Sequence, residues 1–440
     1  NLRERREKVK RIWMGIALAL VLVVLVVSSA CAQKPAPPPT PALKERELIF
    51  HDNVVLTGPM ALSGALITSS HVDGIKWVNE TGIPVKGGVI KLKYVMYETG
   101  YVLDREIAGW QRAKAEGAWF VYSMGSPSAA AFTPLALQDK ILNLCTSEPS
   151  AIFPKANWSL CTTPIYADGM RAVVQWWYDN RFADKGKRVP KIGFIGIDSQ
   201  YGWTGARSAK KFCELKGWEF GPITWTTAAP VDIRTQIMAL KEANVDVVWS
   251  MEVDQGHIMV GKTANELGLK ATIVAQWLVQ GKGVQDALGP AGKGILSHFP
   301  FAPYDSNAPG RVFWNNWLMQ QYGLDGLIKR QDLTYDAGLT TIPILVQAIK
   351  KAGEKVSIDE LTTQHIRDAW KHDLTGYDWD GFISPILTTE DDGRLYAASW
   401  VVELTGTPGV SPVVVSKGWI SPPDLTAEER NPQWWVGKPA

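Results

Sequence analysis

Short apolar segments that alternate with helix-length segments constrain the fold of this chain more than any other feature. A first set of strands is predicted at residues 48–56, 89–97, 118–123 and 141–145, and a second set at residues 191–197, 245–251, 272–275 and 294–298. Such alternation is typical of parallel sheets that are flanked by helices. Two separate sets therefore predict an α/β protein with two doubly wound lobes.

The last third of the chain follows a different pattern. Helices are expected over residues 311–322, 334–352 and 358–370. Pro343 lies inside the second of these and predicts a kink or a break. Beyond Phe382, extended segments at residues 383–387 and 395–404, joined through Asp391-Asp392-Gly393, predict a terminal hairpin.

The first 31 residues have the features of an export signal. A basic stretch precedes an unbroken apolar run from Ile12 to Val27, and small residues follow it. The run is shorter than the ~20 residues of a membrane-spanning helix, so it indicates a secretory signal peptide. Ser28-Ser29-Ala30-Cys31 resembles a bacterial lipobox, in which the cysteine is lipidated, although Ser28 replaces the usual aliphatic residue. Ordinary cleavage near Ala30 and an uncleaved anchor are the alternatives.

Residues 32–46 predict a tether, because they include a proline-rich stretch that is extended and semi-rigid. Such a tether holds a domain away from a membrane. We therefore expect an exported protein, in the periplasm or on the outer face of the cell membrane, that is anchored through a lipid on Cys31.

The composition excludes several classes of protein. The 440 residues include 46 basic and 44 acidic side chains, and 46% are hydrophobic. This charge balance argues against a nucleic-acid-binding protein, and the apolar content argues against a disordered chain. Four cysteines exclude a disulfide scaffold. A Cys145–Cys161 bridge and buried free thiols are both open.

Common catalytic motifs are missing from the sequence. It contains no G-x-S-x-G elbow, no H-E-x-x-H zinc helix and no C-x-x-C pair, and its six histidines are scattered. We therefore expect a binding protein with no catalytic residues, no metal site and no cofactor.

Polar and aromatic residues follow the predicted strands, where parallel sheets bind their ligands. Ser126 and Ser128 follow the strand at residues 118–123 and open a helix, whose N-terminal N–H groups can hold an anion. Ser147 follows the next strand, and Tyr201 follows the strand at residues 191–197. An ordinary turn or helix cap explains each of these positions equally well.

Five segments become recognisable as an ordered set. They are residues 56–64 (LTGPMALSG), 125–128 (GSPS), 198–202 (DSQYG), 264–270 (ANELGLK) and 335–337 (YDA). In this order, behind a lipoprotein-like signal, they resemble the periplasmic branched-chain amino-acid-type (Leu/Ile/Val-binding-like) substrate-binding proteins of ABC transporters. The resemblance covers nearly all of residues 47–405.

The resemblance implies a type I periplasmic-binding fold, with two Rossmann-like lobes joined by three crossings. The first lobe would hold residues 47–162 and 300–381, and the second would hold residues 163–299 and 382–440. A small organic ligand would bind in the cleft, the lobes would close by hinge motion, and an ABC permease in the membrane would sense the closed form.

Some of the family's ligand-binding positions are matched in this sequence, and one is replaced. Ser126, Ser128 and Ser147 match the positions that hold the α-carboxylate of an amino acid, and Tyr201 matches the second lobe's tyrosine. Trp277 stands about where the family often places the acid that pairs with the ligand's ammonium group. Glu252 or Asp254 can replace this acid if either faces the cleft. If so, the ligand is an amino acid or amine, and otherwise an aromatic or aliphatic carboxylate fits better.

Two other functions remain open at this stage. One is an extracellular sensor module that signals to a membrane partner, and the other is an exported α/β enzyme. A permanent anchor with a downstream signalling domain would favour the first, and a nucleophile–base pair in the cleft would favour the second.

Overall fold

The computed structural model describes residues 3–16, 43–145, 148–153, 157–387 and 394–439. Residues 3–16 are helical and belong to a unit separate from the compact body that starts at Lys44. Cys31 and most of the expected tether lie outside the described residues, so lipidation stays a prediction. Among the described helices, none combines the length and the apolar character that a membrane span requires.

Lobe 1 of the body is built on a six-stranded sheet with the order β2-β3-β1-β4-β5-β6. The strands are β1 (Lys44–Val54), β2 (Ile83–Val85), β3 (Gly88–Glu98), β4 (Phe120–Ser123), β5 (Leu142–Cys145) and β6 (Ser159–Cys161). All neighbours are parallel except β2 and β3. The helices that connect these strands are α2 (Ala61–Thr81), α3 (Leu103–Ala115), α4 (Ser126–Asp139) and α5 (Pro149–Ile152).

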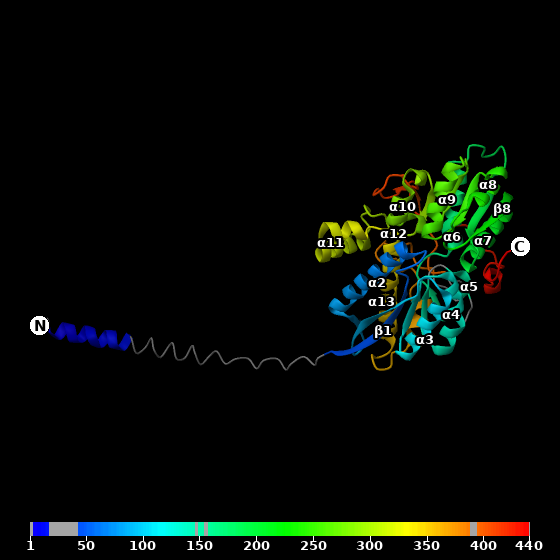
Figure 1. The fold of residues 1–440 in the computed structure, drawn as a ribbon. Coiled ribbons are helices and arrows are strands. Elements are labelled where there is room, and N and C mark those ends of the chain that lie inside the picture. Colours follow the sequence, from blue (N-terminus) through cyan, green and yellow to red (C-terminus); the bar gives the residue numbers. More distant parts are fainter. Residues whose placement is uncertain (1–2, 17–42, 146–147, 154–156, 388–393, 440) are drawn as a thin grey trace. The chain divides into compact units, whose positions relative to one another are not determined.

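Lobe 2 is built on a seven-stranded sheet with the order β13-β12-β11-β10-β9-β7-β8. Its strands are β7 (Lys191–Ile197), β8 (Glu219–Thr226), β9 (Val247–Met251), β10 (Thr272–Ala275), β11 (Leu296–Phe299), β12 (Trp400–Glu403) and β13 (Val413–Val414). Its helices are α6 (Tyr166–Asn180), α7 (Gln200–Lys216), α8 (Arg234–Glu242), α9 (Asp254–Glu266), η1 (Trp277–Gln280), α10 (Lys282–Leu288) and η2 (Gly289–Gly292). Figure 1 shows the two lobes as separate layers of helix and sheet. The predicted fold class is confirmed, while the predicted boundaries between the lobes stay a prediction.

Four later helices follow β11: α11 (Pro309–Arg330), α12 (Leu333–Leu339), α13 (Thr341–Lys355) and α14 (Thr363–His372). Helices α12 and α13 pack against α2 of lobe 1. The break predicted near Pro343 is present, because α12 ends before Thr340 and α13 begins after it. Helix α11 also breaks, at Gly323, whose φ of 67° is a left-handed conformation that favours glycine.

The predicted terminal hairpin is present only where the Leu387 N–H donates to the Leu395 carbonyl oxygen, at 2.7 Å. Farther along the second segment, strand β12 pairs antiparallel with β13 and with β11, and not with residues 383–387. Among those residues, Ile383 makes an isolated bridge to Phe301. The expected turn at residues 391–393 lies outside the described residues. Strand β12 is therefore held by the sheet of lobe 2, and its local sequence pattern could not reveal this long-range partner.

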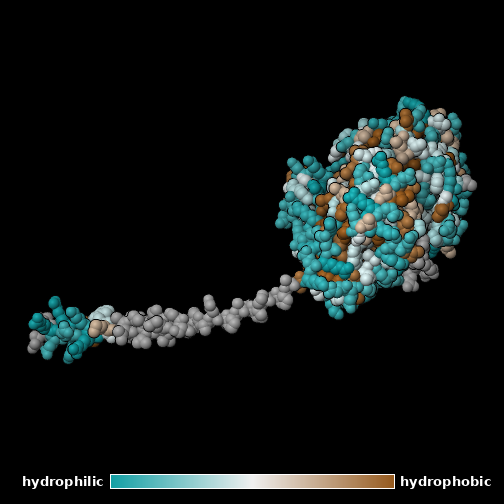
Figure 2. Space-filling model, turned by 60° about the horizontal axis from the view of Figure 1, so that its bottom comes forward, coloured by the Kyte–Doolittle hydropathy of each residue, from teal (hydrophilic) through white to brown (hydrophobic). Residues whose placement is uncertain are grey.

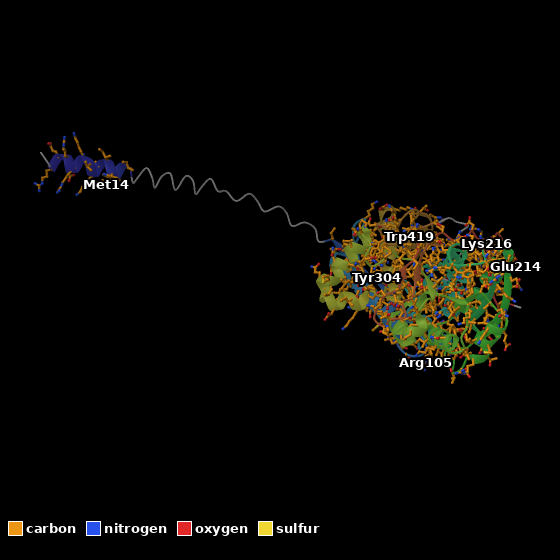
Figure 3. The ribbon with its side chains drawn as sticks, turned by 90° about the horizontal axis from the view of Figure 1, so that it is seen from above. Met14, Arg105, Glu214, Lys216, Tyr304 and Trp419 are labelled. Atoms are coloured by element: carbon orange, nitrogen blue, oxygen red, sulfur yellow. The ribbon has the colours of Figure 1, made fainter. Side chains whose placement is uncertain are left out.

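Most of the tryptophans on these helices pack in the core. Trp177, Trp314, Trp317 and Trp370 are buried. The rings of Trp314 and Trp317 stack with their centroids 4.8 Å apart. By contrast, the surface is mainly hydrophilic, with smaller apolar areas between (Figure 2). Glu214 and Lys216, at the exposed end of α7, lie at this surface (Figure 3).

A buried ion pair joins helices α11 and α12. Arg311 on α11 donates to both carboxylate oxygens of Asp336 on α12, at 3.0 and 2.7 Å. It also donates to the carbonyl oxygen of Ala302, at 2.7 Å. Burial raises the pKa of Asp336 to about 6, although Arg311 lowers it. Arg311 therefore ties α11 to α12 and to Ala302, which follows β11.

Replacing Arg311 by methionine should destabilise the protein by about 3 kcal/mol, because it leaves Asp336 buried without its partner. Urea unfolding of the variant and the native protein measures this difference. The matched control is Lys351→Met, because Lys351 forms an exposed pair with Glu354 and its loss should cost less than about 0.5 kcal/mol. Equal stability of the two variants would contradict the assigned role of Arg311.

Candidate ligand-binding cleft

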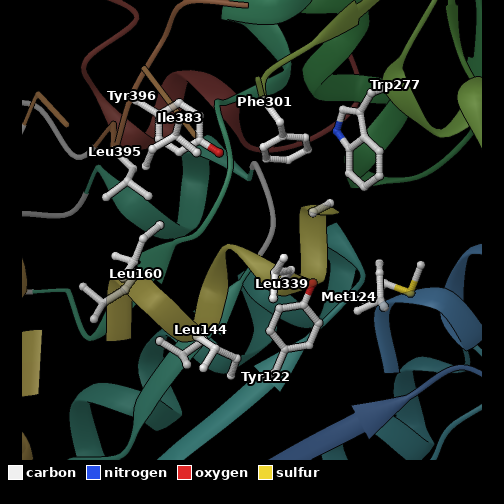
Figure 4. Close-up of a cluster of buried hydrophobic side chains, with 14 of the residues drawn as sticks. Tyr122, Met124, Leu144, Leu160, Trp277, Phe301, Leu339, Ile383, Leu395 and Tyr396 are labelled. Atoms are coloured by element: carbon white, nitrogen blue, oxygen red, sulfur yellow. The ribbon is translucent and has the colours of Figure 1, made fainter. Parts of the chain in front are cut away.

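A small cavity lies where the strand ends of the two lobes meet. Lobe 1 contributes Met60, Tyr101, Met124 and Ser126, and lobe 2 contributes Tyr166, Tyr201, Val253, Trp277 and Leu278. The cavity measures about 10 Å³, which is roughly the room of one water molecule. Figure 4 shows Trp277 and Met124 among the buried side chains of this region. The structure therefore has its lobes closed on an aromatic-lined site, whose side chains must move apart to admit any ligand larger than water.

Ser126 brings the first polar group to the cavity. It is the first residue of α4, whose N-cap, Gly125, has no side chain to satisfy the N–H groups of the first turn. The Ser126 hydroxyl is buried and donates to the Tyr166 hydroxyl at 3.1 Å. Ser128 donates back to the Gly125 carbonyl oxygen at 2.8 Å and is not among the lining residues. Ser126 is therefore the one residue of α4 among the described lining residues.

Tyr101 closes the lobe 1 side of the cavity. Its φ of 64° is a left-handed conformation, which costs a tyrosine about 1–3 kcal/mol. The ring lies so close to Gly125 that a Cβ there would meet Tyr101 at 2.9 Å. Gly125 is therefore required by this close approach, and the strained backbone of Tyr101 points to a functional position.

Lobe 2 supplies two further aromatic walls. Tyr201, near the start of α7, donates to the Glu252 carbonyl oxygen at 3.1 Å and packs edge-on against Tyr166 at 4.9 Å. Trp277 opens η1 and is 3% exposed. Its Nε1 donor has no hydrogen-bond partner among the described residues. A ligand that offers an acceptor can satisfy this indole N–H.

Glu252 is turned away from the cavity. Its Oε1 accepts from the Thr226 hydroxyl at 2.6 Å, and its Oε2 lies against Gly256, where a Cβ would meet it at 2.1 Å. Burial raises the pKa of Glu252 to about 8, because Thr226 offsets little of the desolvation. Between Glu252 and Asp254, Val253 lines the cavity instead.

Asp254 joins the two lobes. At the start of α9 in lobe 2, its carboxylate accepts from the backbone N–H and the hydroxyl of Ser63 on α2 of lobe 1, at 2.9 and 2.5 Å. Burial raises the pKa of Asp254 to about 6. A second contact runs the other way, because the Lys282 N–H of lobe 2 donates to Asp332 of lobe 1 at 2.6 Å. These two contacts form an interlobe clamp.

Glu148 is a buried acid that the sequence analysis did not single out. It begins α5 and accepts from the Ser150 N–H at 3.1 Å and from the Gln200 amide of lobe 2 at 3.2 Å. Burial raises the pKa of Glu148 to about 7, against hydrogen bonds from Ser150, Gln200 and Ser126 that lower it. It therefore connects the cavity serine to the lobe boundary.

Of the residues predicted for the site, the structure brings Ser126, Tyr201 and Trp277 to the cavity. Ser128, Glu252 and Asp254 bond elsewhere, and Ser147 lies outside the described residues. The prediction missed Met60, Tyr101, Met124, Tyr166, Val253 and Leu278. Several of these are sequence neighbours of the predicted residues, so the cavity lies at the predicted strand ends, while the ligand contacts themselves stay a prediction.

One further motif is explained by packing. Residues 256–263 read GHIMVGKT, which has the spacing of a phosphate-binding loop. They lie inside α9, so they form no loop that could cradle a phosphate. Gly261 sits against Leu288, where a Cβ would meet Cδ2 at 2.4 Å. The two glycines therefore serve close packing of the helix.

The other chemistry of the described residues is structural. They contain no group of three or more His, Cys, Asp or Glu side chains that could hold a metal ion. Cys145 and Cys161 are register partners on β5 and β6, and both are buried free thiols. The open alternative of a Cys145–Cys161 disulfide is thus resolved in favour of free thiols in this structure.

The buried acids predict how stability depends on pH. The folded protein holds the Glu252 proton up to about pH 8, whereas an unfolded glutamate loses it near 4.5. Stability should therefore fall as pH rises from about 5 to about 8, by on the order of a few kcal/mol from this group. Glu252→Gln should flatten this slope, as measured by melting temperature against pH. A variant slope equal to that of the exposed-residue control Glu354→Gln would contradict the assignment.

Comparison with known proteins agrees with this geometry. A search of curated proteins found no match. A branched-chain amino acid ABC transporter protein from Thermus thermophilus with bound valine is 19% identical, with a TM-score of 0.72 over 88% of this chain and 98% of that chain. A fatty acid ABC transporter substrate-binding protein from Thermomonospora curvata is 20% identical, with a TM-score of 0.70 over 90% and 96%.

A third structure, a solute-binding protein of an ABC transporter from Rhodopseudomonas palustris in complex with 3,4-dihydroxy benzoic acid, is 16% identical, with a TM-score of 0.64 over 86% of this chain and 95% of that chain. These three structures share the two-lobed fold. The family model described as periplasmic binding protein matches residues 54–408, which is most of the chain. The chain therefore belongs to the periplasmic binding protein family.

Proposed function

We propose that this protein captures a small organic carboxylate between its lobes and delivers it to an ABC permease. The observation that carries the proposal is the nature of the cavity lining. Its polar groups are hydroxyls and an indole N–H, and no charged side chain is among the described lining residues. The protein binds this ligand and changes no covalent bond in it.

The carboxylate would be held by hydrogen-bond donors. Ser126, the first residue of α4, and Trp277 both line the cavity. The Trp277 Nε1 has no partner among the described residues, and the Ser126 hydroxyl, which donates to Tyr166 in this structure, would turn to the ligand. A helix N-terminus favours an anion, and a charge-assisted hydrogen bond is stronger than a neutral one. These donors take the place of an arginine or lysine.

An ammonium group would lack an acceptor in this site. A buried ammonium requires a paired acid, because an isolated charge is costly to bury. Glu252 bonds to Thr226 through Oε1, and its Oε2, which has no partner among the described residues, lies against Gly256 outside the cavity lining. Asp254 is bonded to Ser63 across the lobe boundary. This placement of both acids outside the lining favours the carboxylate over the amino acid, which is the other ligand class left open by the sequence.

The ligand's apolar body would pack against the aromatic walls. Tyr101, Tyr201 and Trp277 offer ring faces and edges, and such contacts contribute about 0.5–1.5 kcal/mol each beyond area burial. Two of the structurally similar proteins are described with a fatty acid and with 3,4-dihydroxy benzoic acid. An aliphatic or aromatic acid thus suits both the lining and these relatives.

The interlobe clamp would convert binding into a signal. A ligand that contacts both lobes shifts the open–closed equilibrium toward the closed form, in which Asp254 reaches Ser63. The permease would recognise that form. Export through the signal at residues 1–31, a lipid on Cys31 and the tether would place the protein beside the permease, outside the cytoplasm.

A thermal-shift screen tests the ligand class. Octanoate and 3,4-dihydroxybenzoate should raise the melting temperature, while L-valine and L-leucine should leave it unchanged. A ligand present at 100 times its Kd stabilises by about 2.7 kcal/mol, which is a readable shift. Stabilisation by valine or leucine alone would overturn the carboxylate proposal.

The site itself is tested by substitution. Trp277→Ala should abolish the shift given by the best carboxylate, because it removes an aromatic wall and a donor. The matched control is Trp176→Ala, since Trp176 is half-buried on α6 and outside the cavity lining. If Trp277→Ala keeps the full melting-temperature shift, the carboxylate does not bind in this cavity.

The clamp is tested on α2. Ser63→Ala removes a hydrogen bond to the Asp254 carboxylate, which contributes about 1.5 kcal/mol or more when the acceptor is charged. We expect the affinity for the best carboxylate to fall roughly tenfold, as measured by calorimetric titration. Ser69→Ala is the control, because Ser69 donates only to Ala65 on the same helix. Equal affinities of both variants would show that the clamp does not assist closure.

A further inference from the structure

The C-terminal segment at residues 424–438, here called the C-terminal strap, lies beyond the part of the chain that matches the family. It contains the short helix η3 (Pro432–Trp435). Figure 1 shows it, in red, beside α5 of lobe 1 and α7 of lobe 2. It therefore sits at the boundary between the two lobes.

Polar contacts fix the strap to lobe 2. Glu429 forms a fully buried ion pair with Arg171 on α6. Arg207 on α7 donates to the carbonyl oxygens of Val436 and Gly437, at 3.0 and 3.1 Å. At the edges of the strap, the Lys211–Glu428 and Lys438–Asp198 pairs add exposed ion pairs of 2.8 and 2.6 Å.

Two apolar side chains of the strap, Leu425 and Trp435, belong to a buried cluster built largely from lobe 1. Trp435 is fully buried, and its ring stacks on Phe153, just after α5, with centroids 6.3 Å apart and planes at 18°. Its cluster includes Ala129 of α4, Cys145 of β5 and Ile152 of α5, together with Ala167 at the start of α6. The ring thus stacks on lobe 1 through Phe153, while the backbone around it is held by lobe 2.

The strap also reaches the cleft through one side chain. The Gln200 amide, at the start of α7, donates to the Trp435 carbonyl oxygen at 2.8 Å and to Glu148 Oε1 at 3.2 Å. Glu148 opens α5 and is linked to the cavity serine, Ser126. The strap, α7 and α5 therefore form one connected contact beside the cavity.

We propose that the C-terminal strap is a latch that ties lobe 1 to lobe 2 in the closed form and slows ligand exchange. Opening that separates α5 from α7 must pull the Trp435 ring out of its cluster or detach the strap from α6 and α7. Either event exposes buried apolar surface or breaks a buried ion pair, and both are unfavourable. The latch acts without a ligand and adds to the Asp254–Ser63 clamp.

Interlobe distances in the ligand-free protein test the latch. Spin labels are attached at Asp104→Cys on α3 and Glu242→Cys on α8, in a Cys31→Ser background. Double electron–electron resonance then measures the distance between the two labels, and so between the lobes. Both labelled positions are exposed, and the other three cysteines are buried. Trp435→Ala should raise the open-to-closed ratio about tenfold, which corresponds to about 1.4 kcal/mol. The peak at longer distance should grow at the expense of the wild-type peak.

Two further variants make the test decisive. Arg207→Ala loosens only the strap's attachment to lobe 2 and should shift the distances in the same direction. Trp419→Ala is the matched control, because Trp419 packs on Trp400 within lobe 2, and it should leave the distances unchanged. Wild-type distances in a folded Trp435→Ala protein would overturn the latch. If that variant does not fold, wild-type distances in Arg207→Ala would overturn it.

Discussion

The interlobe clamp is the interaction on which the rest of this structure depends. Asp254 of lobe 2 reaches Ser63 of lobe 1, and Asp332 of lobe 1 reaches the Lys282 N–H of lobe 2. These contacts help to hold the lobes together around the cavity between the strand ends, beside the Gln200–Glu148 contact. A carboxylate that must meet a partner across a domain boundary is a natural switch, because its contacts exist in one of the two states and not in the other.

The clamp also determines the chemistry of the site. Asp254 is used for closure, and Glu252, which bonds to Thr226 through one oxygen, is not among the lining residues. What remains in the lining is donor groups and aromatic rings. The proposed ligand class rests on where the fold places these acids, and less on which acids the sequence contains.

Sequence reasoning reached the fold and the neighbourhood of the site. Strand–helix alternation predicted both sheets, and the strand-end rule led to Ser126, Tyr201 and Trp277. It did not predict which of several adjacent side chains points into the cavity. Val253 lines the cavity while its neighbours, both predicted, turn away. Tyr101 depends on a left-handed backbone, and Trp435 depends on a contact with Phe153 that is distant in sequence. The residues next to Tyr101 and Trp435 in the sequence form no pattern that predicts either position.

A crystal structure of the protein with 3,4-dihydroxybenzoate tests the central claim most directly. The account predicts the carboxylate beside Ser126 and the start of α4, the ring against Trp277, and Asp254 still bonded to Ser63. A bound carboxylate that lies outside the nine lining residues would contradict the account, as would a closed complex in which Asp254 has left Ser63 to contact the ligand.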